Sequence, residues 1–192
     1  MNEYQDTEIV KDALQVYFSK YHFADGGYND KYFKIKVGPV FIPVPNTPGR
    51  IAAVKIHDIH HMLTEYKATL KGEAEIAGWE LASGCGKYPE AWFLNFGSLC
   101  YGLIFFPLPL CSAFMRGRAM ATSLYYGVTY DNALLNKTIG ELRHYVGIDS
   151  PRNNSIKDYL LFILWSVLGL ATTFMFFFCV YRFLKRLIHG IL

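Results

Sequence analysis

Residues 56–80 of this 192-residue chain read IHDIHHMLTEYKATLKGEAEIAGWE, and they predict two helices joined by a short turn. A cap residue followed by proline, at 46–48, favours a helix start, so the first helix should run from about 48 to 66. The second should run from about 70 to 82 and stop at Gly84. The turn between them is short enough for the second helix to fold back antiparallel on the first.

Polar side chains gather on one face of this helix pair. At about 100° per residue, His57, Asp58 and His61 project into one sector of the first helix. Glu73 on the second helix would lie alongside His61, whereas His60 points away from the middle of the group. Two imidazoles and a carboxylate in such an arc can bind a borderline divalent cation. The residues leave a second interpretation open, a solvated helix surface on which glutamates pair with lysines: Glu65, Glu73, Glu75 and Glu80 with Lys67 and Lys71.

The rest of the chain also predicts mainly helices. Residues 6–20 have the apolar spacing of an amphipathic helix. The stretch FKIKVGPVFIPVP at 33–45 alternates apolar and basic residues before a glycine and proline, which predicts a short hairpin or an extended arm. Three further helices are expected, at 92–114, at 123–135 and at 136–146, the last one ending at Gly147.

One segment predicts attachment to a membrane. Residues 159–181, YLLFILWSVLGLATTFMFFFCVY, carry no charge, and their length suits a helix across a hydrocarbon core of about 30 Å. Arg182, Lys185 and Arg186 follow in a basic tail. The second uncharged run, 92–114, contains Pro107 and Pro109, so we expect a bent segment that does not cross the membrane.

The expected fold is therefore mainly α: a helical membrane-associated domain with a short N-terminal β-hairpin or extended arm and a C-terminal transmembrane helix. Its net charge of +3 and the lack of a basic run with aromatic residues argue against nucleic acid as a partner. The cysteines form no C-x-x-C pair and are expected to be reduced. The expected parts are an N-terminal amphipathic helix and loop at 1–32, a metal domain at 33–150, a linker at 151–158, the transmembrane helix at 159–181 and the basic tail at 182–192.

The motif formed by His57-Asp58-x-x-His61, eleven further residues and Glu73 resembles the signature of the coenzyme Q biosynthesis protein COQ-four family. Weaker similarities accompany it, and together they cover roughly residues 35–150. These are Gly72-Glu73 leading to Trp79-Glu80, with a spacing one residue longer than in the family, and then Arg116-Gly117-Arg118, Glu141-Leu142-Arg143 and Ile148. The chain would be a distant, membrane-anchored member of bacterial type, because the N-terminal region and the appended helix at 159–181 are not usual family parts.

The resemblance implies a mostly helical, membrane-associated fold with a bound divalent metal, usually taken as zinc. It implies His57, Asp58, His61 and Glu73 as the metal ligands and, through the metal, as the catalytic residues. It also implies a hydrophobic channel for a polyprenyl tail. Members of the family are linked to the removal and replacement of the ring carboxyl carbon of a ubiquinone precursor, and to organising the other enzymes of that pathway.

Two functions follow as hypotheses. The first is a metal-dependent decarboxylase, a lyase acting on a polyprenylated hydroxybenzoate-type precursor in quinone biosynthesis. The alternative is a non-catalytic scaffold that binds an isoprenoid lipid and holds other quinone-biosynthesis enzymes at the membrane. A histidine-aspartate phosphohydrolase, with His22 and Asp131 as extra ligands, lacks a supporting motif. We expect a single-pass protein whose metal domain lies on the cytoplasmic side.

Overall fold

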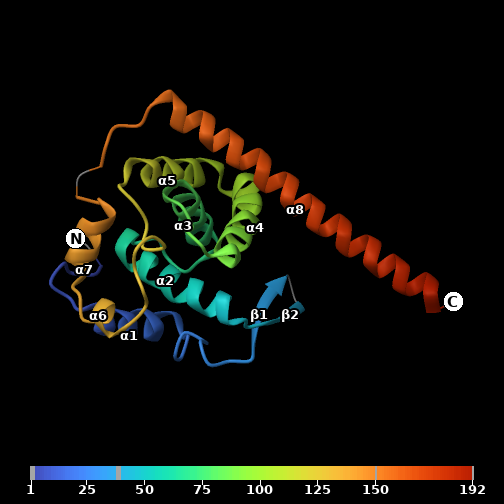
Figure 1. The fold of residues 1–192 in the computed structure, drawn as a ribbon, viewed down its shortest axis with the longest axis horizontal. Coiled ribbons are helices and arrows are strands. Elements are labelled where there is room, and N and C mark those ends of the chain that lie inside the picture. The colour runs from blue at the N-terminus through green and yellow to red at the C-terminus, as the bar shows by residue number, and fades with distance from the viewer. Residues whose placement is uncertain (1–2, 38–39, 150, 192) are drawn as a thin grey trace.

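The computed structural model describes residues 3–37, 40–149 and 151–191, and it confirms a mainly helical fold (Figure 1). Two strands form a single hairpin, and the remaining elements are helices. The elements are α1 (Val10–Tyr21), β1 (Tyr32–Val37), β2 (Val40–Pro45), α2 (Pro48–Thr64), α3 (Leu70–Ser83), α4 (Pro89–Phe105), α5 (Pro107–Ala119), α6 (Asn132–Leu135), α7 (Ile139–Val146) and α8 (Ile156–Ile191).

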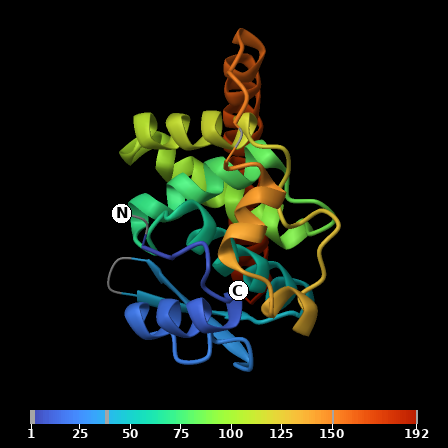
Figure 2. The ribbon, with the colours of Figure 1, turned by 90° about the vertical axis from the view of Figure 1, so that its left-hand side faces the viewer.

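Helix α3 is the centre of the bundle. It packs against α5 and α4 and also contacts α2. Almost all residues in the second half of α3 are therefore buried. A side-chain carbon on Gly78 would lie 2.9 Å from the backbone oxygen of Leu110 in α5, so only glycine allows this close approach. Seen from the side, α1 and the hairpin lie at one end of the molecule and α5 lies at the other (Figure 2).

The two central helices form where the sequence predicts them. The Thr47 hydroxyl accepts a hydrogen bond from the Arg50 amide, and Pro48 occupies the first turn of α2. Helix α2 ends at Thr64, and Glu65 follows in the left-handed conformation with φ 64°. Helix α3 begins after a second threonine cap and stops at Gly84, as expected.

Three arginines that carry part of the family resemblance cap the ends of these helices. The Arg116 guanidinium donates to the carbonyl of Thr64 at 2.7 Å, and Arg143 donates to the carbonyl of Leu63 at 3.3 Å. Arg118 donates to the carbonyl of Ala82 near the end of α3. The last carbonyls of a helix have no partner within it, so these side chains satisfy groups that would otherwise be buried without hydrogen bonds.

The N-terminal part contains the expected amphipathic helix, α1. Of the two structures predicted for residues 33–45, a hairpin or an extended arm, the hairpin is the one that forms. Strands β1 and β2 pair antiparallel, with Tyr32 opposite Pro45 and Val37 opposite Val40. The helix predicted at 123–135 is wrong for most of its length, because only α6 is helical there. The preceding residues form an irregular segment whose backbone is bound by neighbouring groups, as the Leu124 amide donating to His60 Nε2 at 3.0 Å shows.

The apolar run 92–114 is bent, as its prolines predict. Helix α4 ends at Phe105, the backbone breaks at Phe106, and Pro107 starts α5. Both helices pack on α3. The turn between them exposes large apolar side chains, with Leu108 82% exposed and Ile104 71% exposed.

Helix α8 is longer than the expected transmembrane segment. It begins at Ile156, so the predicted linker loses its last three residues, and it runs on through the basic residues to Ile191. The early start has a local cause, because the Ser155 amide donates to the Asp158 carboxylate at 2.8 Å, as in a capping box. Within the described residues, this helix alone is long and apolar enough to cross a membrane, with a mean hydropathy of 2.2 over Ile156–Arg182.

Candidate metal centre

Three of the four predicted ligands come together on α2 and α3. The Nε2 atoms of His57 and His61 lie 3.1 Å apart. One oxygen of Glu73 lies 3.5 Å from Nε2 of His57, and the other lies 3.4 Å from Nε2 of His61. This group of His57, His61 and Glu73 could hold a metal ion.

The spacing of these atoms matches a tetrahedral metal site. Bonds of about 2.1 Å at tetrahedral angles, as zinc forms with imidazole and carboxylate, place neighbouring ligand atoms about 3.4 Å apart. The two imidazole nitrogens lie 3.1 Å apart, and each lies 3.4 or 3.5 Å from a different oxygen of Glu73, so each of these contacts is close to that value. Three protein ligands leave one coordination position for water or a ligand, which is the arrangement of catalytic rather than structural zinc sites.

Hydrogen bonds on the far side of each imidazole set its tautomer. Nδ1 of His57 donates to Glu80 at 3.0 Å, and Nδ1 of His61 donates to the backbone carbonyl of Tyr66 at 2.7 Å. With these hydrogens on Nδ1, the two Nε2 atoms face each other and can share a proton or bind a cation. Two lone pairs at this distance repel unless a proton or a cation lies between them, and metal-binding histidines are typically oriented in this way.

The turn between α2 and α3 supplies both the Tyr66 carbonyl and the position of Glu73. A side-chain carbon on Gly72 would lie 1.8 Å from the backbone oxygen of Lys67, so the turn closes this tightly only with glycine at position 72. The Thr69 hydroxyl caps α3 by accepting from the Gly72 amide. Glu73 therefore lies in the first turn of α3, opposite His61.

Glu80 is the main site residue that sequence reasoning missed: it was named in a weak part of the family resemblance and in the helix-surface alternative, but not among the site residues. Its side chain is 1% exposed and accepts hydrogen bonds from four neighbours. Besides His57, these are the Nδ1 atom of His60 at 2.7 Å, the amide of Asn95 at 2.6 Å and the hydroxyl of Tyr125 at 3.1 Å. A signal was present, because Glu73 and Glu80 are two helical turns apart and so share one face of α3.

His60 and Asp58 bind other groups. His60 is fully buried, and its two ring nitrogens are occupied by Glu80 and the Leu124 amide, in keeping with the expectation that it points away from the ligands. The carboxylate of Asp58 accepts a hydrogen bond from the hydroxyl of Tyr28 at 2.6 Å. Asp58 is thus close in sequence to the group of three but is not among the grouped ligand atoms.

The charges around the group favour a cation. Burial alone would lower the pKa of His57, but the carboxylates of Glu80 and Glu73 outweigh it and raise that pKa well above its usual value. Burial likewise would raise the pKa of Glu73, yet its hydrogen bonds to His57 and His61 lower it below the usual range. Two ionised carboxylates therefore stabilise positive charge at the imidazoles, and a bound divalent ion would supply that charge.

The group opens into a cavity of about 430 Å³ between α2, α3 and α4. Its wall combines polar groups with apolar side chains such as Val54 and Leu94. Arg50 also lines it, stacked 3.5 Å from the centre of the Phe33 ring. Among the described residues, Nε of Arg50 has no hydrogen-bond partner, although it is buried. An anionic ligand would satisfy it.

Comparisons of the chain with protein-family models, with curated proteins and with solved structures found no match. The resemblance to the coenzyme Q biosynthesis family therefore depends on the motif residues themselves. Of these, His57, His61 and Glu73 form the candidate metal group, and Asp58 stays a predicted ligand.

Proposed function

We propose that this protein binds one divalent metal, zinc, and uses it on a prenylated ring precursor of a ubiquinone-like quinone. The observation that carries the proposal is the close group of possible ligand atoms from His57, His61 and Glu73 at the edge of a cavity. The reaction class we favour is removal of a ring carboxylate, as a metal-dependent decarboxylase. When bound, the metal would act as a Lewis acid on a ring oxygen or carboxylate.

Different side chains of the protein would have different roles in binding such a ring. His57, His61 and Glu73 hold the ion, and Glu80 orients His57. Arg50 would pair with the ring carboxylate, because it lines the cavity and its Nε lacks a hydrogen-bond partner among the described residues. The apolar residues of the wall would exclude water from the ring.

A second cavity supports a lipid tail on the ligand. It has a volume of about 580 Å³ and lies between α4 and α8, and its lining is mostly apolar and aromatic. Leu94 and Ser98 line both this cavity and the one beside the metal group. A prenyl tail could therefore occupy the groove between α4 and α8 while its ring reaches the metal past these two residues.

Asp58→Asn distinguishes an open metal site from a closed one. If three residues hold the ion, this variant should keep its metal, because the amide can still accept from Tyr28 and no ligand is lost. Elemental analysis of the purified protein measures the stoichiometry. Loss of most of the metal would make Asp58 a fourth protein ligand, and a closed site would favour the scaffold function over catalysis.

Tail length should control the affinity for the lipid. Each methylene buried in the groove contributes about 0.8 kcal/mol, so affinity should rise roughly fourfold per methylene until the groove is full. Binding across a series of prenyl lengths measures this. Ser98→Phe, which narrows the passage between the two cavities, should abolish the dependence and keep the metal. Equally weak binding of short and long tails to the unchanged protein would refute the lipid site.

The alternative function is a non-catalytic scaffold that holds an isoprenoid lipid and other quinone-biosynthesis enzymes at the membrane. The same groove and the same helix α8 support it. For either function we propose a single-pass protein with the metal domain on the cytoplasmic side. An impermeant thiol reagent added on that side should then label Val16→Cys, whose position is 52% exposed on α1.

A further inference from the structure

Helix α8 packs on the folded domain with the middle of its apolar length. The ring of Trp165 lies 5.2 Å from that of Trp92 in α4, and Thr173 lies 3.1 Å from the Cys100 sulfur. Further along, the ring of Phe176 lies 5.3 Å from that of Phe93. These contacts bracket residue 170, the centre of the uncharged segment 159–181.

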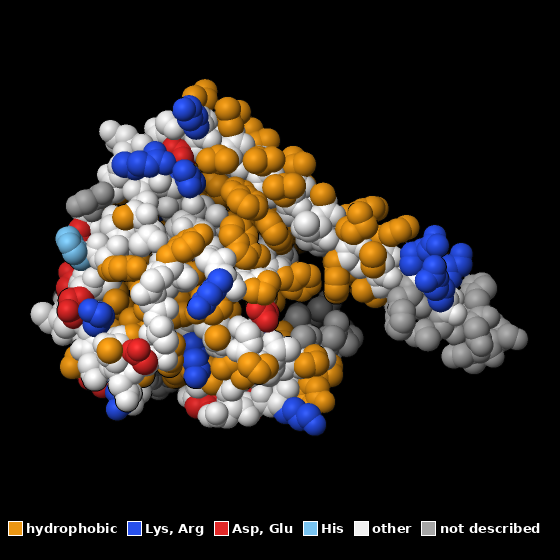
Figure 3. Space-filling view, in the orientation of Figure 1, with side chains coloured by type: hydrophobic (Ala, Val, Ile, Leu, Met, Phe, Trp, Pro, Cys, Tyr) orange, Lys and Arg blue, Asp and Glu red, His pale blue; other side chains and the backbone are white. Residues whose placement is uncertain are grey.

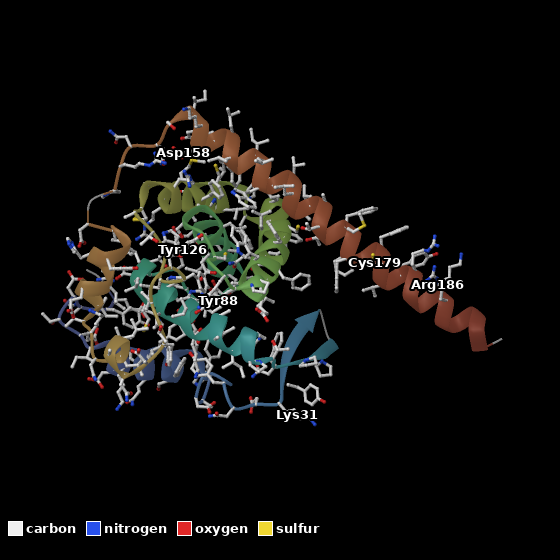
Figure 4. The ribbon with its side chains drawn as sticks, viewed as in Figure 1. Lys31, Tyr88, Tyr126, Asp158, Cys179 and Arg186 are labelled. Atoms are coloured by element: carbon white, nitrogen blue, oxygen red, sulfur yellow. The ribbon has the colours of Figure 1, made fainter. Side chains whose placement is uncertain are left out.

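The start of α8 is held to the domain as well. The side chain of Asp158, in the first turn of α8, is buried, with 1% exposure, and two arginines bind it. Arg118 of α5 donates to its carboxylate at 3.0 Å, and Arg152 donates at 2.7 Å. Figure 4 shows Asp158 against the domain, and Cys179 and Arg186 on the part of α8 that projects beyond it.

The projecting part is too short to cross a bilayer by itself. The ring contacts with α4 extend to Phe176, and Phe177 still lines the cavity between α4 and α8. Residues 178–191 would extend about 21 Å at 1.5 Å per residue, less than a hydrocarbon core of about 30 Å. They also include Arg182, Lys185 and Arg186. If the whole apolar segment of α8 lies in a bilayer, the hydrocarbon core must therefore include the part of α8 that contacts α4.

The side of the domain beside α8 suits such burial. No charged residue occurs from 91 to 115, which covers α4 after Glu90 and most of α5. Phe93, Ile104, Phe105 and Leu108 are each more than half exposed there, even though Phe93 also contacts Phe176 of α8. Hydrophobic side chains also cover α8, with basic side chains near its two ends (Figure 3). Apolar surface of this extent marks an interaction site.

We propose that α8, the outer face of α4 and the α4–α5 turn lie together in the hydrocarbon core of a bilayer and stay packed on one another there. The domain is then partly immersed in the membrane, and α8 is not a free stalk that carries it clear of the surface. A bilayer fits better than a second copy of the chain, because Lys157 at one end and the basic tail at the other suit the head-group regions that flank an apolar segment. The proposal does not depend on the metal or on the enzymatic function.

Cross-linking in lipid tests whether α8 stays on α4. In a Cys111→Ser, Cys179→Ser background, Thr173→Cys places a thiol opposite that of Cys100. Mild oxidation of the full-length protein in vesicles of phosphatidylcholine and phosphatidylglycerol should form this disulfide in most molecules. Phe174→Cys, one residue on and 74% exposed, is the control and should not form it. Equal, low yields for both variants would mean that α8 leaves the domain in the membrane, and the proposal would fall.

Spin labels then report whether α4 lies in hydrocarbon. Labels at Phe93→Cys and Ile104→Cys, in the same vesicles and a background that also contains Cys100→Ser, should be relaxed by oxygen and shielded from an aqueous nickel chelate. A label at Val16→Cys should show the reverse. Chelate access at 93 and 104 equal to that at 16 would overturn the proposal. So would shielding that persists in detergent with dipolar broadening between copies, because that result assigns the face to a dimer.

Discussion

Replacement of His61 by alanine should remove most of the bound metal. The variant loses one of three ligands, and the remaining His57 and Glu73 retain only part of the site. The imidazole is 1% exposed and makes one hydrogen bond outside the group, to the Tyr66 carbonyl, so the fold should survive its truncation. Elemental analysis after purification without added metal measures the loss, and circular dichroism checks the helix content.

His144→Ala is the matched control, because that side chain is 86% exposed on α7 and away from the group. It should keep the metal content of the unchanged protein. An unaltered stoichiometry in His61→Ala would refute the metal site. Loss of metal from a His60 variant, with no loss from His61→Ala, would show that His60 binds the metal and that His61 does not.

Glu80→Gln should weaken metal binding by about 10–100-fold while the fold persists. The glutamine oxygen can still accept from His57, but it lacks the charge that makes the imidazole a stronger ligand. Asn95 can rotate its amide to accept from the new amide group, so the buried hydrogen bonds survive. Competition with a chromophoric chelator measures the affinity. An affinity equal to that of the unchanged protein would show that Glu80 does not act on the metal through His57.

Glu80→Ala should have a different effect, since it removes the acceptor for four buried donors. Leaving such groups unpaired should cost about 3–5 kcal/mol of the free energy of unfolding. Denaturant unfolding in mild detergent measures it. Glu75→Gln on the same helix is the control, because Glu75 only pairs with Lys71 at 3.7 Å on the surface, and it should change stability by less than about 1 kcal/mol.

The local pattern of the sequence determined most of the helices and part of the site. Helix α2 was predictable because a cap residue and a proline start it, and the end of α3 was predictable because Gly84 follows it. His57 and His61 were predictable as a pair, since residues four apart share a helix face whatever surrounds them. The apolar length of α8 was likewise readable from composition alone.

Tertiary structure decided what a local pattern does not encode. Glu80 could be surface or core by spacing, and it is a buried acceptor only because α4 and the segment at 123–126 close over it. That segment is not helical: the Leu124 amide donates to Nε2 of His60, and the Ser123 hydroxyl donates to the Gly84 carbonyl. The placement of α8 along α4 also depends on contacts between residues more than 70 positions apart, such as Cys100 and Thr173. Such contacts arise from packing, so hydropathy predicts that α8 enters a membrane but not which helix goes with it.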